Sequence, residues 1–537
     1  MNAGSWRGRL RRHGAGTLMV CLLFVVGSSV ATVVLASSPD KRASFNAEQV
    51  VEQARALAAQ PFQPVPDALP EVLRSLDYDG HRAIRFRPDQ AVWRDAGRFQ
   101  LQFFHPGFLF TEPVDIALVD GGVAHPLPFD RTRFRYDPPV TDLAPALDAD
   151  DVEVPGWAGF RVHYPLHAPS RADEFLVFLG ASYFRVIGRN QGYGISARGL
   201  AIDTVRPQGE EFPAFRAFWI ERPATDATTL VIHALLDSPS VTGAYRFIVT
   251  PGASTAVDVD AVVFARESVE RLGIAPLTSM FTHGDTSVGG ADDHRPRVHD
   301  SDGLLVRASH GEWTWRPLSN PRQLREFGFI DQSASGFGLL QRERAFDQYL
   351  DAEARYERRP GKWVEPLDGD WGSGRVVLVE IPTESEIHDN IVAFWESDAP
   401  LQAGEVRRFR YRLTTVGAWQ PAPALAQVVR TRQGHGATPG TNAPPPDSLR
   451  HFSVVFRGGE AASLAADNPP DVQLESRHGS IDAVRTDRLA NADWLVSFLL
   501  TPEPGQVADL RLWLTSDGRT VSETWSFAWD ADALHGR

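Results

Sequence analysis

Residues 375–395, RVVLVEIPTESEIHDNIVAFW, decide the fold that the sequence predicts. The apolar runs RVVLVEI and NIVAFW have the length and β-branched content of buried strands. The polar segment between them carries Glu384, Glu386 and Asp389 and is predicted to be the loop that joins the strands. Carboxylates on a loop held by two rigid strands suit proton transfer. A solvated acidic loop without a chemical role is the alternative.

Similar short apolar runs predict strands along most of the chain. Examples between residues 99 and 251 are FQLQFF, FLVFLGASYFRVI, TTLVIHALL and YRFIVTP. Apolar residues recur with a helical period mainly in residues 46–60, NAEQVVEQARALAAQ, and in residues 67–76, DALPEVLRSL. The 537 residues include 44 Gly and 39 Pro, which supply the turns between many short strands. The sequence therefore predicts an all-β protein.

The N-terminus has the features of a targeting segment. Four arginines precede an apolar stretch from Thr17 to Ala36, and no acidic residue occurs before Asp40. A basic start, an apolar core and the small-residue end Val34-Leu35-Ala36 predict an export signal over residues 1–36. About 20 apolar residues can also just span a bilayer, so an uncleaved membrane anchor is the alternative.

Charge and cysteine content limit the partners and the chemistry of the exported part. The net charge is −14 and becomes −18 without residues 1–36. Such a surface repels nucleic acid and anionic lipid, and it suits either a neutral ligand or one bound by local contacts rather than by the overall field. The one cysteine, Cys21, lies in the apolar targeting stretch, so no disulfide or thiolate metal site is expected beyond it.

Three regions follow the targeting segment. Residues 44–416 are predicted to form the main β domain. Residues 417–446, with the low-complexity run GHGATPGTNAPPPD, are predicted to be a linker or a long loop. Residues 447–537 contain five or more short strand patterns in about 100 residues, which fits an immunoglobulin-like sandwich.

A second acidic motif, VHDSDGLL at residues 298–305, places Asp300 and Asp302 two positions apart. In an extended segment positions i and i+2 face the same side, so both carboxylates are expected to line one groove. An Asx turn ending at Gly303 is the alternative. The spacing of nearby histidines matches no common zinc pattern, and no nucleophile elbow, P-loop or dinucleotide fingerprint occurs. We therefore expect no metal and no cofactor.

Aromatic and basic side chains lie near these acids in the sequence and suggest a sugar-binding groove. Rings can pack on the apolar faces of sugars while polar groups bind the hydroxyls. The alternative for each ring is a place in the core. The candidate substrate-binding residues are Tyr193, Arg198, Trp313, Trp315, Tyr356, Trp363 and Trp395.

Six long motifs carry a resemblance to a known family. They are YFRVIGRNQGYGISARGLAIDT, GEEFPAFRAFWIERP, RPRVHDSDGLL, GEWTWRPLSNPRQL, GFGLLQRERAFDQYLDAEARYERRPGKWVEP and IPTESEIHDNIVAFW. In these motifs and their order the chain resembles the periplasmic glucan biosynthesis proteins, the MdoG/OpgG and OpgD family. The resemblance runs from Phe45 to the C-terminus. It implies a large galactose-mutarotase-like β-sandwich followed by a smaller immunoglobulin-like domain, located in the periplasm.

The resemblance also implies an activity on osmoregulated glucans with β-1,2-linked backbones. Similar members are inverting glycoside hydrolases, and some relatives transfer the chain and close a ring. The family's acid falls on Asp389, its base on Asp300 or Asp302 with a preference for Asp300, and Glu386 is a supporting carboxylate. We expect Glu384, Glu386 and partial burial to raise the pKa of Asp389.

Two other functions stay open at this stage. The chain could serve as a non-catalytic glucan-binding partner of a membrane glucan synthase, with its acids idle. A mutarotase-like activity rests only on fold analogy, which is weak ground because one fold hosts many functions. Besides the glucan, the expected partner is therefore such a synthase, and nucleic acid is excluded.

Overall fold

The computed structural model describes residues 44–530, except 67, 150–153, 288–291, 369–370, 418–420, 423, 437–445 and 447–448. These residues belong to one compact unit, Ala43–Arg537. The predicted targeting segment 1–36 and most of the low-complexity run lie outside the described residues. No helix in the described part of the chain has the length and apolar character needed to cross a bilayer.

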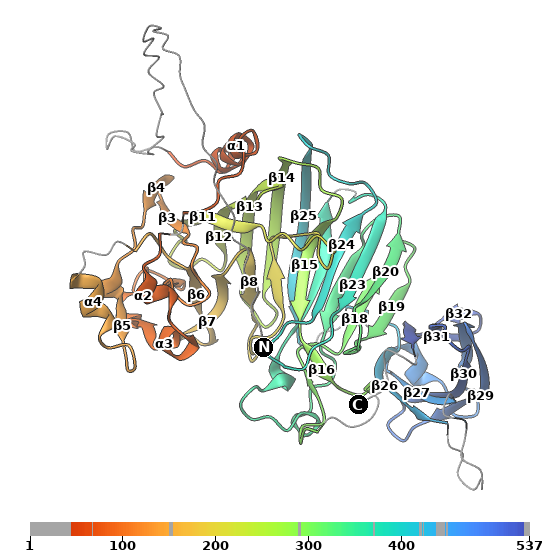
Figure 1. Ribbon diagram of the computed structural model, residues 1–537. Coiled ribbons are helices and arrows are strands. Elements are labelled where there is room, and N and C mark those ends of the chain that lie inside the picture. Colours follow the sequence, from red (N-terminus) through yellow and green to blue (C-terminus); the bar gives the residue numbers. More distant parts are fainter. Residues whose placement is uncertain are drawn as a thin grey trace, which may run out of the picture. The chain divides into compact units, whose positions relative to one another are not determined.

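The prediction of an all-β protein is confirmed: two large sheets dominate the described residues (Figure 1). The first sheet has the order β2(Gln100–Phe104), β6(Gly159–Ala168), β7(Arg171–Leu179), β8(Tyr183–Val186), β9(Ser196–Arg198), β15(Leu272–Ser279), β24(Ile391–Ser397), β23(Gly374–Glu380) and β20(Arg325–Asp331), with β10(Leu200–Ile202) on β15.

The second sheet is longer and reaches into the C-terminal part of the chain. Its order is β28(Asp471–Arg477), β31(Ala508–Ser516), β33(Thr524–Trp529), β19(Trp313–Pro317), β18(Gly303–Arg307), β21(Gly336–Leu340), β22(Gly361–Asp368), β25(Val406–Val416), β14(Ala256–Ala265), β13(Val241–Thr250), β12(Leu230–Asp237), β11(Ala214–Glu221), β3(Asp115–Asp120) and β4(Val123–Pro126), with β32(Arg519–Thr520) on β31.

Smaller elements complete the fold. Three further sheets are β1(Ile84–Phe86) with β5(Phe134–Tyr136), β16(Phe281–His283) with β17(Val298–His299), and β26(Gln427–His435), β27(Arg450–Arg457), β30(Trp494–Pro502) and β29(Gly479–Arg488). The helices are α1(Ala47–Ala58), α2(Glu71–Arg74), α3(Tyr78–Arg82) and α4(Leu143–Ala149), with 3₁₀ turns η1(Pro88–Gln90), η2(Arg131–Arg133), η3(Phe346–Gln348), η4(Tyr356–Arg358) and η5(Glu460–Ser463).

Aromatic side chains from both large sheets meet and make the two sheets a sandwich. Phe160 of β6 lies 5.0 Å from Phe218 of β11, measured between ring centroids. Phe178 of β7 lies 5.1 Å from Phe247 of β13. Full burial of one such side chain contributes about 1.5–3 kcal/mol, so this layer holds the sheets together.

The predicted N-terminal helix is confirmed and the second is much shorter than expected. Asn46 and Gln49 form a capping box at the start of α1, and Val50 and Ala54 pack on β12–β14. The predicted helix over residues 67–76 is reduced to the single turn α2, whose N-cap is Pro70. A helix cannot continue upstream through this proline, because its ring restricts the preceding residue and removes a donor.

The C-terminal strands form a second core. The predicted strand patterns appear as β27, β28, β30, β31 and β33, with Phe452, Phe498 and Trp525 packed between their two sheets. Strand β26 lies in residues expected to be a linker and pairs with β27. Strand β33 also pairs in parallel with β19, Thr314 opposite Thr524, so one C-terminal sheet continues the second large sheet.

The strand–loop–strand prediction for residues 375–395 is confirmed. Strands β23 and β24 pair from Gly374–Ser397 to Glu380–Ile391, and residues 381–390 form the loop between them. Buried Asn390 closes the loop. Its amide nitrogen donates to Phe281 O and Ile381 O, and its side-chain oxygen accepts from the Phe281 N–H. The loop that carries Asp389 therefore has a fixed base.

Candidate active site

Asp389 lies two residues before β24, in the same sheet as two strands that each carry an arginine. In the first sheet β8, β9, β15 and β24 are neighbours, which brings Arg185 of β8 and Arg198 of β9 near Asp389. These two arginines and Arg359 lower the pKa of Asp389, but desolvation by the surrounding protein outweighs them and raises it. The side chain is nevertheless open to water. This combination fits a concave surface, where the surrounding protein partly desolvates a group that water can still reach.

Of the expected causes of the raised Asp389 pKa, burial is confirmed, whereas Glu384 and Glu386 are not among the causes. Glu386 does not act on Asp389; its Oε2 accepts a hydrogen bond from Tyr356 Oη at 2.7 Å and pairs with Arg295 at 2.9 Å. Burial raises the pKa of Asp389, and no neighbouring carboxylate is among the causes. Glu384 and Glu386 were therefore the wrong explanation. None of the described residues donates a hydrogen bond to the Asp389 carboxyl group.

Asp300 joins the same electrostatic neighbourhood from a distant part of the chain. It follows β17, its N–H donates to Met280 O at 2.9 Å, and it is 4% exposed. Its Oδ1 accepts from Arg359 Nη1 at 2.5 Å. Burial raises the pKa of Asp300, Arg359 opposes the shift, and the charge of Asp389 adds to it. The charge of Asp389 thus acts on Asp300, and Arg359 and Arg185 act on both acids.

A chain of contacts holds Arg359 in place. Its guanidinium lies 4.2 Å from the centroid of the Tyr356 ring, and its Nε and Nη2 donate to Ala354 O. The Tyr356 hydroxyl and Arg295 Nη1 both donate to Glu386 Oε2. This chain links the Asp389 loop to the segment that pairs with Asp300. Glu386 is therefore close to the site but has a positioning role in the structure.

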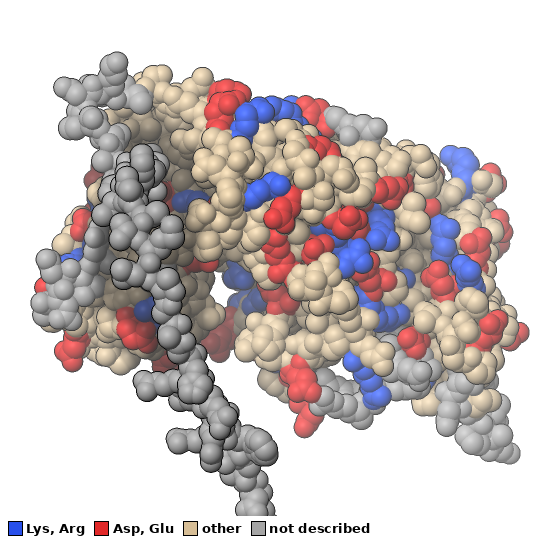
Figure 2. Space-filling view, turned by 45° about the horizontal axis from the view of Figure 1, so that its top comes forward, with Lys and Arg blue, Asp and Glu red and all other residues tan. Residues whose placement is uncertain are grey.

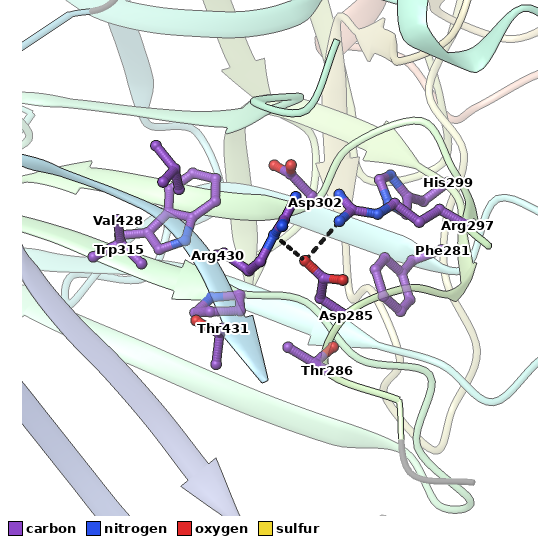
Figure 3. A pocket seen from close by; sticks show the side chains of 12 residues that line it. Phe281, Asp285, Thr286, Arg297, His299, Asp302, Trp315, Val428, Arg430 and Thr431 are labelled. Atoms are coloured by element: carbon purple, nitrogen blue, oxygen red, sulfur yellow. Dashed lines mark hydrogen bonds and ion pairs between the residues drawn. The ribbon is translucent and has the colours of Figure 1, made fainter. Parts of the chain in front are cut away.

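Asp302 has different neighbours from Asp300. Its carboxylate accepts the backbone N–H groups of Arg342 and Glu343 at 3.1 and 3.2 Å. It lines a cavity of about 30 Å³ with Asp285 and Arg297, shown in Figure 3. That volume is of the order of one or two water molecules, far less than a sugar. The i, i+2 rule does not apply, because residues 300–302 lie between β17 and β18 rather than within a strand.

Most of the aromatic candidates fill cores instead of facing a groove. Trp395 is buried in the main core, and Trp315 and Trp363 are buried in the C-terminal one. Trp313 stacks on Trp363 with the ring centroids 5.5 Å apart. Tyr193 packs against the main core. A sequence pattern cannot separate these roles, because a large ring stabilises a core as well as a binding surface.

The structure adds aromatic residues that the sequence did not single out. The guanidinium of Arg198 lies 4.8 Å from the Tyr183 ring and 5.5 Å from that of Phe212, which is 52% exposed. Glu210 fixes Arg198 through a 2.5 Å ion pair. Burial raises the pKa of Tyr183, and the charges of Glu210 and Asp389 add to the shift, so the ring is near the acid. Tyr183 and Phe212 lie in the quoted motifs, but no spacing rule marked them.

The surface charge is mixed. Figure 2 shows acidic and basic side chains interspersed over one face of the molecule. Within the described residues no group of three His, Cys, Asp or Glu side chains could hold a metal ion. We refer to Asp300, Asp389, Arg185 and Arg359 as the two-acid cluster; its two carboxyl groups can donate or accept protons.

Comparison with known proteins gives a consistent result over nearly the whole chain. Residues 45–529 match the family described as "Periplasmic glucan biosynthesis protein, MdoG". A Vibrio cholerae protein named Glucans biosynthesis protein G is 46% identical over 491 residues, covering 91% of this chain and 87% of its own length. The protein of that name from Shewanella frigidimarina is 44% identical over 493 residues, covering 91% and 85%.

Proposed function

Because the chain belongs to the MdoG family of periplasmic glucan biosynthesis proteins, we propose that it acts in the periplasm as an enzyme on β-1,2-linked glucan. A role in glucan biosynthesis follows from the family. The proposed reaction is cleavage of the backbone with inversion, or transfer of the cleaved chain to another hydroxyl. The observation that carries the proposal is the two-acid cluster, in which Asp389 and Asp300 share two arginines.

Asp389 is proposed to be the general acid. A donor must hold its proton at working pH, and desolvation raises the pKa of Asp389 in that direction. It must also reach the substrate, and the side chain is open to water. Asp389 would protonate the glycosidic oxygen as the bond from C1 to that oxygen breaks.

Asp300 is proposed to be the general base. Burial raises the pKa of Asp300, and the ion pair with Arg359 opposes this shift and favours the charged carboxylate that a base requires. Water attacks C1 from the face opposite the leaving group, and its proton passes to Asp300. Because Asp300 is almost closed to solvent, we propose that a hydroxyl or a second water relays this proton. A sugar hydroxyl in place of the attacking water would give transfer instead of hydrolysis.

Tyr183 and Phe212 are proposed to contact the glucan. Their rings flank Arg198, and an exposed ring, Phe212, with a half-buried one, Tyr183, beside a guanidinium suits the mixed apolar and hydroxyl surface of a sugar. Arg198 itself is nearly buried and is held by Glu210 and Thr278. It would orient the rings and moderate the pKa of Asp389.

The test is incubation of the purified protein with linear β-1,2-glucan, with products separated by size and the new reducing ends followed by proton NMR. We expect shorter chains whose new ends appear first as the α-anomer, because inversion converts a β-linkage. Cyclic products would indicate transfer. A linear β-1,3-glucan of similar length is the control and should stay intact. A bound but unchanged β-1,2-glucan would support the alternative, a non-catalytic partner of a membrane glucan synthase.

A further inference from the structure

A second cavity, separate in its lining residues from Asp300 and Asp389, has a volume of about 650 Å³. It is formed by the segment after β8 and by residues of the long connection between β21 and β22. Its charged lining residues are Arg189, Arg344, Arg355, Glu357 and Arg358. We refer to it as the arginine cavity.

The charge of this cavity is opposite to that of the protein. Four arginines face one glutamate in its lining, whereas the whole chain has a net charge of −14. Like charges gathered in one concave space repel each other, and low-dielectric walls strengthen the field. A bound anion would relieve this repulsion, and guanidinium groups bind phosphate and carboxylate oxygens in pairs.

The four arginines do not have equal roles. Arg344 is a structural brace, because its terminal nitrogens donate to the carbonyls of Glu357, Arg359 and Val416. Arg355 Nε donates to Glu357 at 2.6 Å.

Arg189 and Arg358 have N–H groups to which no acceptor is assigned among the described residues. Arg189 uses Nε to bind Leu166 O, and among the described residues no acceptor is assigned to its terminal nitrogens. Arg358 has only a 3.8 Å pairing between Nε and Glu357. These two side chains therefore hold the donors that an incoming anion can use.

The cavity is much larger than a bare inorganic anion and lies in the usual size range of small-molecule sites, roughly 300–1,000 Å³. Phe346, one of the lining residues, is 44% exposed, and the central guanidinium carbon of Arg355 lies 5.4 Å from the centroid of its ring. Asn190 and Ser254 add an amide and a hydroxyl. Together these groups match a charged sugar. The ring can pack on its apolar face, the neutral polar groups can bind its hydroxyls, and the arginines can bind its oxyanion.

We propose that the arginine cavity binds a saccharide that carries a phosphate or carboxylate group. This inference extends the expectation of a neutral ligand, which the net charge alone suggested. It does not depend on the assignment of Asp389 and Asp300, because none of the cavity's donors belongs to the two-acid cluster.

The test is calorimetric titration of the whole protein at low salt with glucose 6-phosphate, glucuronate, inorganic phosphate and glucose. Wild type, Arg189→Gln and Arg358→Gln are compared. The matched control is Arg485→Gln, which removes the same charge from β29. We expect one saturable site for at least one anionic sugar, weakened about tenfold in each cavity variant, since a charge-assisted hydrogen bond is lost. The control should stay within about twofold.

Each other outcome counts against the proposal. Glucose that binds as tightly as the anionic sugars, or cavity variants that bind like Arg485→Gln, would overturn the anion site. Inorganic phosphate that matches glucose 6-phosphate would overturn the saccharide assignment. Both substituted arginines are surface side chains, and melting curves of the variants verify that each is folded before titration.

Discussion

Asp300 and Asp302 are two residues apart, yet they belong to regions with opposite character. Asp300 lies in the two-acid cluster with Asp389. The Asp389 side chain is open to water, and none of the described residues donates a hydrogen bond to its carboxyl group. Asp302 lies beside a C-terminal ion-pair cluster, defined by Asp285, Arg297, Arg342, Arg430 and Glu523. There Glu523 is fully buried and forms a bidentate pair with Arg342 at 2.7 and 2.8 Å.

The contrast is between Asp389, whose carboxyl group accepts no hydrogen bond from the described residues, and the carboxylates of the ion-pair cluster. In the ion-pair cluster every carboxylate has close donors; Asp285, for example, lies 2.7 Å from Arg297 and 3.4 Å from Arg430 (Figure 3). Removal of one partner from such a pair leaves an uncompensated buried charge. In the two-acid cluster the charges of Arg185 and Arg198 act on Asp389 without a direct bond, which leaves its proton available. Five substitutions test this contrast.

The largest effect is expected for Asp389→Asn. The amide keeps the shape but cannot deliver a proton, so turnover of β-1,2-glucan should fall by about 10³-fold or more. Glucan binding and the melting temperature should change little, because the carboxylate has no hydrogen bond to lose. Initial rates, binding titration and thermal melts measure these three quantities.

Asp517→Asn is the matched control for that variant. Asp517 lies in the turn between β31 and β32 at a φ of 49°, a conformation that Asn adopts equally well. It should keep wild-type turnover. An active Asp389→Asn protein would remove this residue from the mechanism.

The next comparison is Asp300→Asn against Asp302→Asn. The first should lower turnover by about 10²-fold or more, because the base is lost. The second should keep turnover per folded molecule within about threefold. It should cost about 1 kcal/mol of stability, because one of two backbone donors loses its acceptor. Urea unfolding and initial rates on the same samples separate the two effects. The reverse pattern would move the base to Asp302.

The sequence predicted the strands around the site better than the contacts within it. Residues 375–395 formed the expected strand–loop–strand unit, because the polar residues between two continuous apolar strands form the loop that connects them. The order of distant strands could not be derived in this way. The neighbourhood of Arg185 and Asp389 depends on β8 and β24 lying in one sheet, and the parallel pair β19–β33 joins residues far apart in the chain.

The site residues show the same limit. The family resemblance supplied Asp389 and Asp300, whereas the aromatic pattern selected Trp315, Trp363 and Trp395, which are buried. Composition marks a ring but not the direction in which it points. Arg359 escaped notice because nothing in its local sequence shows a pairing with a residue 59 positions away.

Arg342→Met tests the structural side of the contrast. It leaves Glu523 buried without its partner, which should cost about 3 kcal/mol or more and lower the melting temperature. Turnover per folded molecule should be nearly unchanged. The double variant Arg342→Met with Glu523→Gln should recover part of the loss, because the uncompensated charge is gone. A single variant as stable as the wild type would show that the pair contributes nothing.

The smallest expected effect is a shift of the pH profile in Arg185→Gln. The charge of Arg185 lowers the pKa of Asp389 and of Asp300, so its removal raises both. Asp389 must be protonated, and its pKa sets the alkaline limb of the profile. Asp300 must be ionised, and its pKa sets the acid limb. Both limbs of kcat/KM should therefore move to higher pH, with little change in the melting temperature because Arg185 is exposed. Arg485→Gln should leave the profile in place. A shift to lower pH would mean that the two limbs belong to other groups.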